Sequence, residues 1–331
     1  GGPEPVSVSA AAGWHFDLYV QGLGLTKELR VRIVDDDVTC GSPATVPSFF
    51  LASACTGGIC GTPRFEFSDG VRWDNMKITK RGVYRVCSCT AGLASGGNST
   101  LDCVENESFS VPAGSVSISG PDSNWTIVPA IGATFDVRVE SSDFIEPTTE
   151  IRLVDGRCGI NATMDPPDGV YVLPQRTPEM EGGVAVWRNV AILRSAAFYV
   201  CWCPGGQGFS CGVASHFEVV AGNIRPRGPS HAALRLNVAL RTPFTMNLTG
   251  NGLSSMDQMR IIKASDSCGS LVAGDFTREV SYYIPLPEGR WRSSPKDGPP
   301  TTTCADGSCE AWGPLMLTER GTYRVCWCRD P

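Results

Sequence analysis

The sequence predicts an all-β fold in three tandem units, and three observations support that prediction. A stretch of eight residues occurs three times, starting at Gly82, Ala196 and Gly321. Each copy ends with two cysteines that are separated by one other residue. A tryptophan precedes the first of these cysteines by fourteen residues in every copy. Those tryptophans are Trp73, Trp187 and Trp312. Elsewhere, short alternating apolar runs lie between glycines and prolines, as in sheets of short strands. A spacing kept through three copies indicates a repeat of about 110 residues.

The first unit, residues 1–113, is expected to begin with three strands. Val6–Ser9, Trp14–Val20 and Leu29–Ile33 each alternate apolar and polar residues, which is the pattern of a strand with one buried face. More strand is expected near Trp73 and in the repeat that follows it. Short strands separated by turn residues predict a β-sandwich or barrel in each unit.

The second unit, residues 114–222, and the third, residues 223–331, repeat these elements. Val116–Ile118 matches the opening strand of the first unit, and Leu234–Val238 matches it in the third. The expected joins are Val111–Gly114 and Val219–Gly222. Such short joins predict a rod of domains with limited bending. The third unit is expected to be incomplete at its C-terminal end.

Composition narrows the class of protein. Of the 331 residues, 42% are hydrophobic, which is typical of a globular chain. A net charge of −6 argues against a nucleic-acid partner, which requires a concentrated basic face. No apolar run of about 18 residues occurs, so no membrane span is expected. Fifteen cysteines in matching places indicate an oxidising compartment, so we expect a secreted or cell-surface protein.

Sequons for N-glycosylation support an extracellular location. They occur at Asn98, Asn106, Asn124, Asn161 and Asn247. The chain begins Gly1-Gly2-Pro3 without a signal peptide, and we interpret it as a mature or excised piece of something longer.

The cysteines predict a disulfide framework. One pair occurs in the first and third units and is absent from the second, which predicts Cys55–Cys60 and Cys304–Cys309. Each unit has an early cysteine before its repeat, and the first two units have a late cysteine after it. A short separation in sequence favours a bond between the second cysteine of the repeat and the late cysteine. The first cysteine of the repeat then pairs with the early cysteine. The expected pairs are Cys89–Cys103, Cys203–Cys211, Cys40–Cys87, Cys158–Cys201 and Cys268–Cys326. The crossed alternative within each unit stays open, because sequence does not fix connectivity.

Fourteen of the fifteen cysteines enter these expected pairs, and Cys328 is the exception. The third unit has no late cysteine after its repeat. We expect the partner of Cys328 in a strand that follows Pro331 in a longer natural chain.

Each repeat is expected to present two different faces. Tyr84, Val86 and Ser88 share one face of the strand, whereas Cys87 and Cys89 share the other. The aromatic face is the expected core, so the cysteines face away from it under loops. The pattern predicts an Ig-like sandwich without the central disulfide of antibody domains. A twisted or bulged strand would reverse these faces.

The pattern Gly-x-Tyr-x-Val-Cys-x-Cys, closing each unit, resembles the cysteine-rich repeats of large surface proteins in alveolate protists. It is also similar to the repeats of mastigoneme-type flagellar hair proteins in algae. The pattern covers all three units, and its specific part is about sixteen residues in each. The resemblance implies an extracellular, tandem role that is structural or adhesive, and it brings no catalytic residue. Ser88 stands where the other two copies have tryptophan.

No pattern of residues predicts catalysis or a cofactor. The histidines His15, His216 and His231 lie far apart in sequence, and no Gly-x-Ser-x-Gly motif occurs. A C-x-C spacing favours disulfides over zinc knuckles. Asp35–Asp37 has the carboxylates that Ca²⁺ prefers, but only one unit carries it, so we interpret it as a solvated loop. We therefore expect no enzyme, no metal and no cofactor.

The segment between the early cysteine and the tryptophan varies most in length among the units. In the third unit it contains Tyr282, Tyr283 and Trp291. Repeat proteins place recognition on variable loops of a constant scaffold, so these residues are candidates for contact with a partner or a glycan. One further strand with loop cover is the alternative that the sequence favours.

These features together predict a structural extracellular protein, a tandem-repeat building block of a surface filament or fibrous appendage. The expected partners are other copies of the chain or neighbouring repeats of a longer one, with glycans as a further candidate. A surface adhesin or glycan-binding ectodomain is the alternative.

Overall fold

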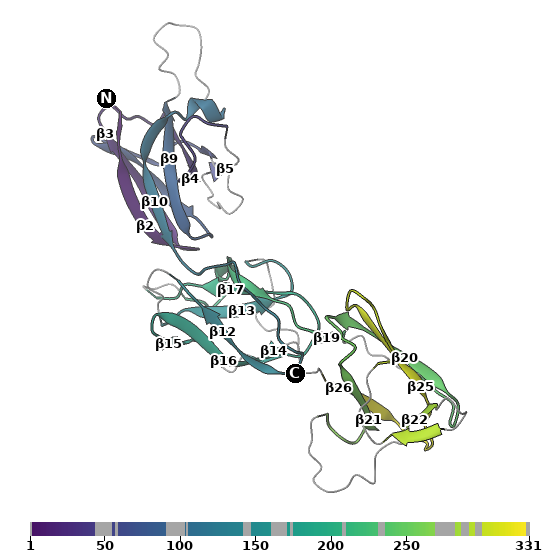
Figure 1. The fold of residues 1–331 in the computed structure, drawn as a ribbon. Coiled ribbons are helices and arrows are strands. Elements are labelled where there is room, and N and C mark those ends of the chain that lie inside the picture. The colour runs from purple at the N-terminus through teal and green to yellow at the C-terminus, as the bar shows by residue number, and fades with distance from the viewer. Residues whose placement is uncertain are drawn as a thin grey trace.

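The computed structural model shows short β-strands and, among the residues that it describes, two 3₁₀ helices, Asn106–Ser108 and Ala214–His216. Those residues are 2–43, 55–56, 59–90, 103, 105–141, 147–159, 171–172, 175–206, 210–230, 236–268, 282–285, 291–294 and 300–328, with backbone only for 55–56, 171–172, 282–285 and 291–294. The strands fall into an N-terminal, a middle and a C-terminal group of sheets that follow one another along the molecule (Figure 1). Within those described ranges, no helix is long and apolar enough to cross a membrane.

Two sheets make up the N-terminal group. Its strands are β1 (Pro3–Glu4), β2 (Val6–Ala11), β3 (His15–Gly22), β4 (Leu29–Asp35), β5 (Cys55–Thr56), β6 (Ile59–Cys60), β7 (Phe65–Phe67), β8 (Gly70–Lys77), β9 (Gly82–Thr90) and β10 (Val111–Ser119). The sheet orders are β1-β3-β8-β7 and β2-β10-β9-β4-β6-β5. This order and the chain connections between the sheets are those of an Ig-like sandwich.

The middle group repeats that order. Its strands are β11 (Thr126–Ile127), β12 (Thr134–Val139), β13 (Glu150–Val154), β14 (Tyr171–Val172), β15 (Glu179–Glu181), β16 (Val184–Ile192), β17 (Phe198–Cys203) and β18 (Val219–Ile224). The sheets are β11-β18-β17-β13 and β12-β16-β14, and β15 also pairs with β16. The cysteine repeat is β17 here and β9 in the N-terminal group, and each is flanked by the strand that follows it.

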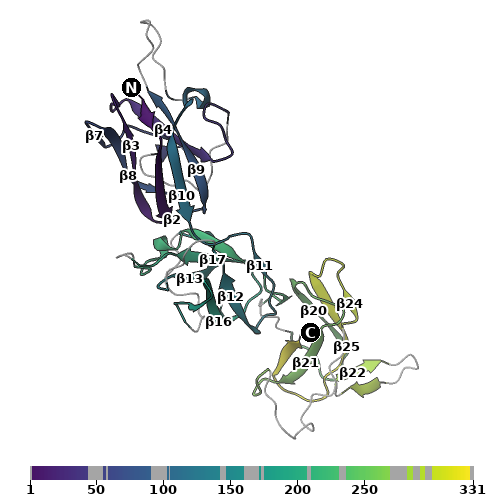
Figure 2. The same cartoon turned by 60° about the vertical axis from the view of Figure 1, so that its left-hand side comes forward.

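The C-terminal group repeats the order with fewer strands beside its cysteine repeat (Figure 2). Its strands are β19 (Gly228–Pro229), β20 (Phe244–Asn251), β21 (Gln258–Lys263), β22 (Tyr282–Pro285), β23 (Trp291–Ser294), β24 (Thr302–Thr303), β25 (Cys309–Leu315) and β26 (Tyr323–Cys328). The sheets are β19-β20-β25-β24, β21-β26 and β22-β23.

Apolar and polar residues alternate along the strands, and the apolar ones form the buried core. The three tryptophans that fix the repeat spacing are buried. The indole of Trp73 donates a hydrogen bond to the carbonyl of Gly61 at 2.9 Å, and that of Trp187 donates to Arg176 at 2.8 Å. The hydroxyl of Tyr84 donates to the carbonyl of Lys80 at 2.9 Å, which is the tyrosine corner of Ig-like folds.

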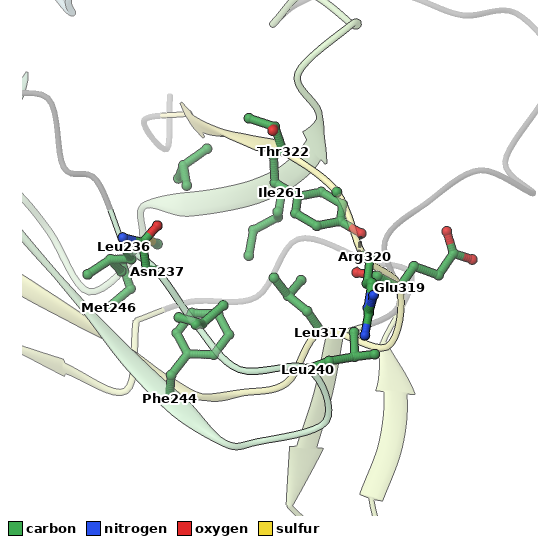
Figure 3. Close-up of a pocket in the computed structure, with 14 residues that line it drawn as sticks. Leu236, Asn237, Leu240, Phe244, Met246, Ile261, Leu317, Glu319, Arg320 and Thr322 are labelled. Atoms are coloured by element: carbon green, nitrogen blue, oxygen red, sulfur yellow. Dashed lines mark hydrogen bonds between the residues drawn. The ribbon is translucent and has the colours of Figure 1, made fainter.

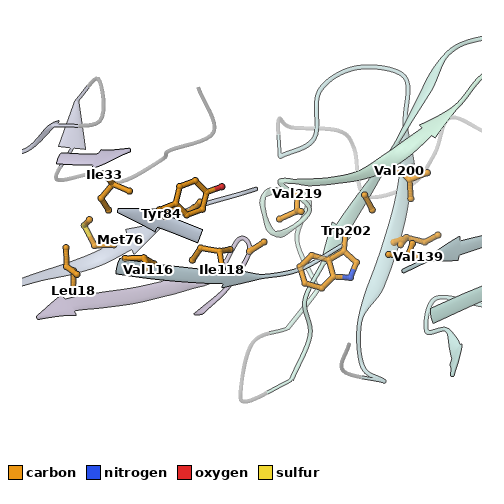
Figure 4. Packing of buried hydrophobic residues seen from close by; sticks show 14 of the residues in the cluster. Leu18, Ile33, Met76, Tyr84, Val116, Ile118, Val139, Val200, Trp202 and Val219 are labelled. Atoms are coloured by element: carbon orange, nitrogen blue, oxygen red, sulfur yellow. The ribbon is translucent and has the colours of Figure 1, made fainter. Parts of the chain in front are cut away.

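The predicted faces of the repeat strand are confirmed. Tyr84 and Val86 belong to the main buried cluster, which lies between the two sheets (Figure 4). Cys87 and Cys89 belong to a separate small cluster with Phe109, on the outer side of the sheet. The middle group has the same outer cluster.

Both expected joins are wrong as linkers, because they lie inside strands. β10 runs from Val111 to Ser119 and pairs antiparallel with β9 and parallel with β2. Val116–Ile118, expected to open the second unit, thus closes the sheet of the first, where both ends of that segment are buried. β18 pairs in the same way with β17 and β11. A last strand that fills the core of one unit looks in sequence like the first strand of the next.

Candidate functional site

The cysteine layer braces each group on its outer side. The structure forms Cys40–Cys87, Cys89–Cys103, Cys158–Cys201, Cys203–Cys211, Cys268–Cys326 and Cys304–Cys309. This connectivity is the one that locality favours over the crossed alternative. Cys60 is disulfide-bonded and lies opposite Cys55 in the β5–β6 pair, but the side chain of Cys55 lies outside the described atoms. Cys328 is exposed at the end of β26.

Arginine side chains tie this layer to the early-cysteine loop. Arg85, between the cysteine face and the loop, donates to the carbonyl of Val38 at 3.0 Å. Arg324, at the same place in the third repeat, donates to the carbonyl of Asp266 at 2.9 Å. In these two groups, the arginine two residues before the first cysteine of the repeat thus holds the loop that carries the disulfide partner. Arg152 in the middle group stacks on Phe217 with its guanidinium carbon 4.8 Å from the ring centroid.

The sequons have different surroundings. Asn124 and Asn247 are exposed. Asn106 is half-buried, and its side-chain oxygen accepts a hydrogen bond from Arg32. Asn98 and Asn161 lie outside the described residues.

Residues 120–125 connect the N-terminal and middle groups at their joint, and this segment is hydrogen-bonded to the middle group. We define the joint by the residues that meet there, which include Gly13, Lys77, Glu218 and Val219. The ammonium of Lys77 lies 2.6 Å from the carboxylate of Glu218, and both side chains are at least four-fifths buried. A methyl group added at Gly13 would lie 2.9 Å from a methyl carbon of Val219. Buried residues of both groups form one continuous hydrophobic cluster through the joint (Figure 4).

Polar contacts surround the joint. The amide of Gly13 donates to the carbonyl of Ile78 at 2.8 Å, and Arg81 lies 3.4 Å from Asp122. His15 is at the edge of the joint. Burial, followed by the nearby positive charge of Lys77, lowers the pKa of His15. The sequence analysis did not identify the joint, since its residues come from four separate strands and turns.

The joint between the middle and C-terminal groups is built differently. Gly228 of β19 lies between Ile131 and Trp327, and an added Cβ would lie 2.8 Å and 3.2 Å from them. The side-chain amide of Asn251 donates to the carbonyl of Pro226 at 3.2 Å. The C-terminal group nevertheless has its own buried cluster, separate from the one shared by the other two groups.

A pocket of about 440 Å³ lies beside Trp125 in the middle group. Asp122, Asn124, Asp136 and Glu140 contribute polar groups to its lining. The indole lies against Gly222, where a Cβ would come within 2.2 Å of the ring. The pocket therefore combines an aromatic wall with carboxylates, and sequence reasoning missed it because Asn124 and Trp125 lie in a short irregular segment before β11.

The aromatic residues expected in the third variable segment come together on one hairpin. β22 and β23 pair antiparallel, with Tyr282 opposite Ser294, Tyr283 opposite Ser293 and Trp291 opposite Pro285. Their side chains lie outside the described atoms, so their role in partner contact stays a prediction. The matching segments of the first and second units, 41–72 and 159–186, are described only in part.

The other side chains considered for chemistry are separated. Asp36 forms an ion pair with Arg85 at 3.3 Å, and the carbonyl of Asp35 accepts a hydrogen bond from Val38. The described part of the chain contains no group of three or more His, Cys, Asp or Glu side chains that could hold a metal ion. His216 contacts the carbonyl of Ser210, and His231 lies outside the described residues.

Comparison with known proteins gives no family. No family model matches the chain, and no curated protein matches it. Among solved structures, the N-terminal four Ig domains of Dscam1 isoform 4.4 align with 98% of this chain and 75% of their own, at 9% identity and a TM-score of 0.15. The same region of isoform 4.44 aligns with equal coverage and identity, at a TM-score of 0.14. The Ig-like character of the sheets follows from their strand order and not from these alignments.

Proposed function

We propose that the chain is a structural segment of an extracellular filament or fibrous appendage, built from tandem disulfide-braced Ig-like domains and without catalytic chemistry. The division into three such domains, secretion and glycosylation are parts of this proposal. The resemblance of the repeat to those of mastigoneme-type flagellar hair proteins and protist surface proteins implies the same role.

One observation carries the proposal, namely the packed joint between the N-terminal and middle groups. Domains that move independently need flexible linkers, whereas a stiff rod needs fixed angles between neighbouring domains. The joint has a shared hydrophobic cluster and a largely buried Lys77–Glu218 pair, and its connecting segment, residues 120–125, is hydrogen-bonded to the middle group. Disulfides on the outer side of each sheet add resistance to unfolding outside the cell.

Electron microscopy of the protein isolated from its natural source tests this role. We expect regular filaments whose repeat equals one or a few domains. Isolated short rods at all concentrations would contradict the filament. Peptide mapping of the same material checks secretion, since Asn124 and Asn247 are expected to carry glycans.

A second candidate, a glycan-binding adhesin, is favoured by the pocket at Trp125. An aromatic wall with carboxylates around it is a surface on which a sugar ring can stack and donate hydrogen bonds. Glycan-array binding that is lost in Trp125→Ala and kept in Trp14→Ala would support the adhesin. Absence of binding to any glycan would remove this candidate and leave the structural role untouched.

A further inference from the structure

The pocket beside Trp125 lies between two parts of the chain that are separate in sequence. Asn124 and Trp125 belong to the connecting segment, residues 120–125, whereas Glu140 directly follows β12. A backbone hydrogen bond joins the two parts, from the amide of Asp122 to the carbonyl of Glu140 at 3.0 Å. A ligand in this pocket would therefore hold the connecting segment against the sandwich of the middle group.

The charge and the size of the pocket restrict its ligand. The charged groups of its lining are the carboxylates of Asp122, Asp136 and Glu140 and the guanidinium of Arg138, so an anion would be repelled. Sugar hydroxyls can donate hydrogen bonds to carboxylates, and the apolar face of a sugar ring can pack on the indole of Trp125. The volume of about 440 Å³ is near the lower end of the ~300–1,000 Å³ of small-molecule sites, which suits one or two sugar rings.

Asn124 can supply such a sugar directly beside the pocket. Asn124-Trp125-Thr126 is a sequon, and Asn124 is exposed and contributes to the lining of the pocket. A glycan on this residue therefore starts at the pocket, and its first sugar loses less entropy on packing there than a free ligand would. The larger groove of the C-terminal group, of about 830 Å³ and walled by Leu236 and Phe244 (Figure 3), has no sequon asparagine on its described lining.

Asn247 provides the comparison, because the surface around it is different. It is exposed on β20 in a row of exposed polar side chains with Thr245 and Thr249. This row offers a sugar no aromatic ring, so a glycan on Asn247 is expected to extend into solvent.

We propose that the first N-acetylglucosamine of a glycan on Asn124 packs on Trp125 in this pocket and fastens the connecting segment to β12. The glycan is added during secretion, when Nδ2 of Asn124 loses a proton and displaces a lipid diphosphate carrier from C1 of the sugar. The inference rests on the proposed extracellular, glycosylated chain, and it adds the ligand of the pocket and an effect on the first joint. A pocket filled in this way is closed to the glycans of other molecules, so the adhesin is the alternative to it.

Amide hydrogen exchange tests the fastening. The full chain is secreted from a eukaryotic host, and an endoglycosidase trims each glycan to one N-acetylglucosamine. Asn124→Gln and Thr126→Ala both remove the sugar at this site, and Asn247→Gln removes the control sugar. We expect exchange in residues 122–127 and 134–140 to be faster by about threefold or more in the first two variants and unchanged in Asn247→Gln.

Magnetic resonance of the unmutated protein detects the contact directly. We expect nuclear Overhauser effects between the trimmed sugar on Asn124 and the indole protons of Trp125, and none from the sugar on Asn247. In Trp125→Leu, removal of the sugar by Asn124→Gln should no longer change the exchange rates, because the packing partner is gone. Circular dichroism checks that each variant folds, and the Overhauser measurement needs no variant.

Three results would overturn the inference. The first is a sugar on Asn124 that gives no Overhauser effect with Trp125 and whose removal leaves exchange unchanged. The second is an unmodified Asn124 in a secreted chain whose Asn247 carries a glycan, which would leave the proposed extracellular role intact. The third is a chain from the natural source with no glycan at either residue, which would also overturn the glycosylation in the proposed function.

Discussion

At the scale of single residues, the C-terminal group differs from the others by a buried acid pair. Asp257 and Glu310 are both fully buried, and the amide of Ser254 donates to both carboxyl groups, at 2.9 Å and 3.0 Å. The matching positions in the N-terminal group are Leu29 and Val71. Burial, together with the hydrogen bond and the charge of Asp257, raises the pKa of Glu310 to about 7.

This pKa makes the stability of the C-terminal group depend on pH. An exposed glutamate in the unfolded chain has a pKa of about 4.3. The folded state therefore binds more protons than the unfolded state between this pH and about 7. The free energy of unfolding is therefore highest below that window and falls as pH rises through it. We expect Glu310→Gln to flatten this dependence and to stabilise the group at pH 8. Denaturant unfolding at pH 5 and pH 8 measures it, with exposed Glu319→Gln as the control; an unchanged slope in Glu310→Gln would contradict it.

A second residue-scale prediction concerns Gly222, which lies under the ring of Trp125. An added methyl carbon would meet the ring at 2.2 Å, and the strand cannot shift without losing its pairing to β17. We expect Gly222→Ala to destabilise the middle group by about 1–3 kcal/mol through overpacking. Thermal unfolding checks this, and Gly156→Ala provides the comparison, because its added methyl group meets no atom within 4 Å and neither glycine has a left-handed backbone.

At the scale of elements, the two disulfides of β17 offer an internal comparison. Cys158–Cys201 closes a loop with a sequence separation of 43, and Cys203–Cys211 closes one with a separation of 8. Both cysteines of the strand are fully buried, so replacement by alanine leaves similar holes. The difference between the two bonds should then come mainly from the restriction of the unfolded chain.

Loop-closure entropy gives about 4 kcal/mol for the longer loop and about 2.5 kcal/mol for the shorter one. We therefore expect the double alanine variant of Cys158 and Cys201 to lose more stability than that of Cys203 and Cys211. Guanidinium unfolding of the two variants measures the difference. The reverse order would show that strain or residual structure outweighs chain entropy.

The elements also show how far sequence reasoning reached. The alternating runs, the aromatic face of the repeat and the disulfide spacing depend on neighbours along the chain, so the strands and their faces were predictable. Val116–Ile118 was assigned to the wrong unit because its pattern fits either a closing or an opening strand, and only pairing with β2 and β9 decides between them. The joint and the pocket at Trp125 depend on contacts between distant segments, which carry no local pattern.

At the scale of the whole molecule, the joint sets the angle between the N-terminal and middle groups. Removing one partner of the Lys77–Glu218 pair leaves a largely buried charge, with an expected cost to the closed joint of about 1–3 kcal/mol. We expect Lys77→Ala and Glu218→Ala each to broaden the distribution of distances between spin labels placed on the two groups. Arg64→Ala breaks an ion pair away from the joint and should leave the distribution unchanged. Equal widths in all variants would show that the apolar contacts alone hold the joint.

β10, the last strand before the first joint, decides how the N-terminal group responds to being pulled. Tension along the chain enters β10 lengthwise, and its hydrogen bonds to β9 and β2 lie across the direction of pull. These hydrogen bonds are therefore loaded in shear at the same time, and they cannot break one after another. Behind them, Cys40–Cys87 and Cys89–Cys103 lock most of the N-terminal group against lengthening. A tandem array of such units would be stiff under small forces. When one sandwich unfolded, the chain would lengthen only by the residues outside the disulfide loops.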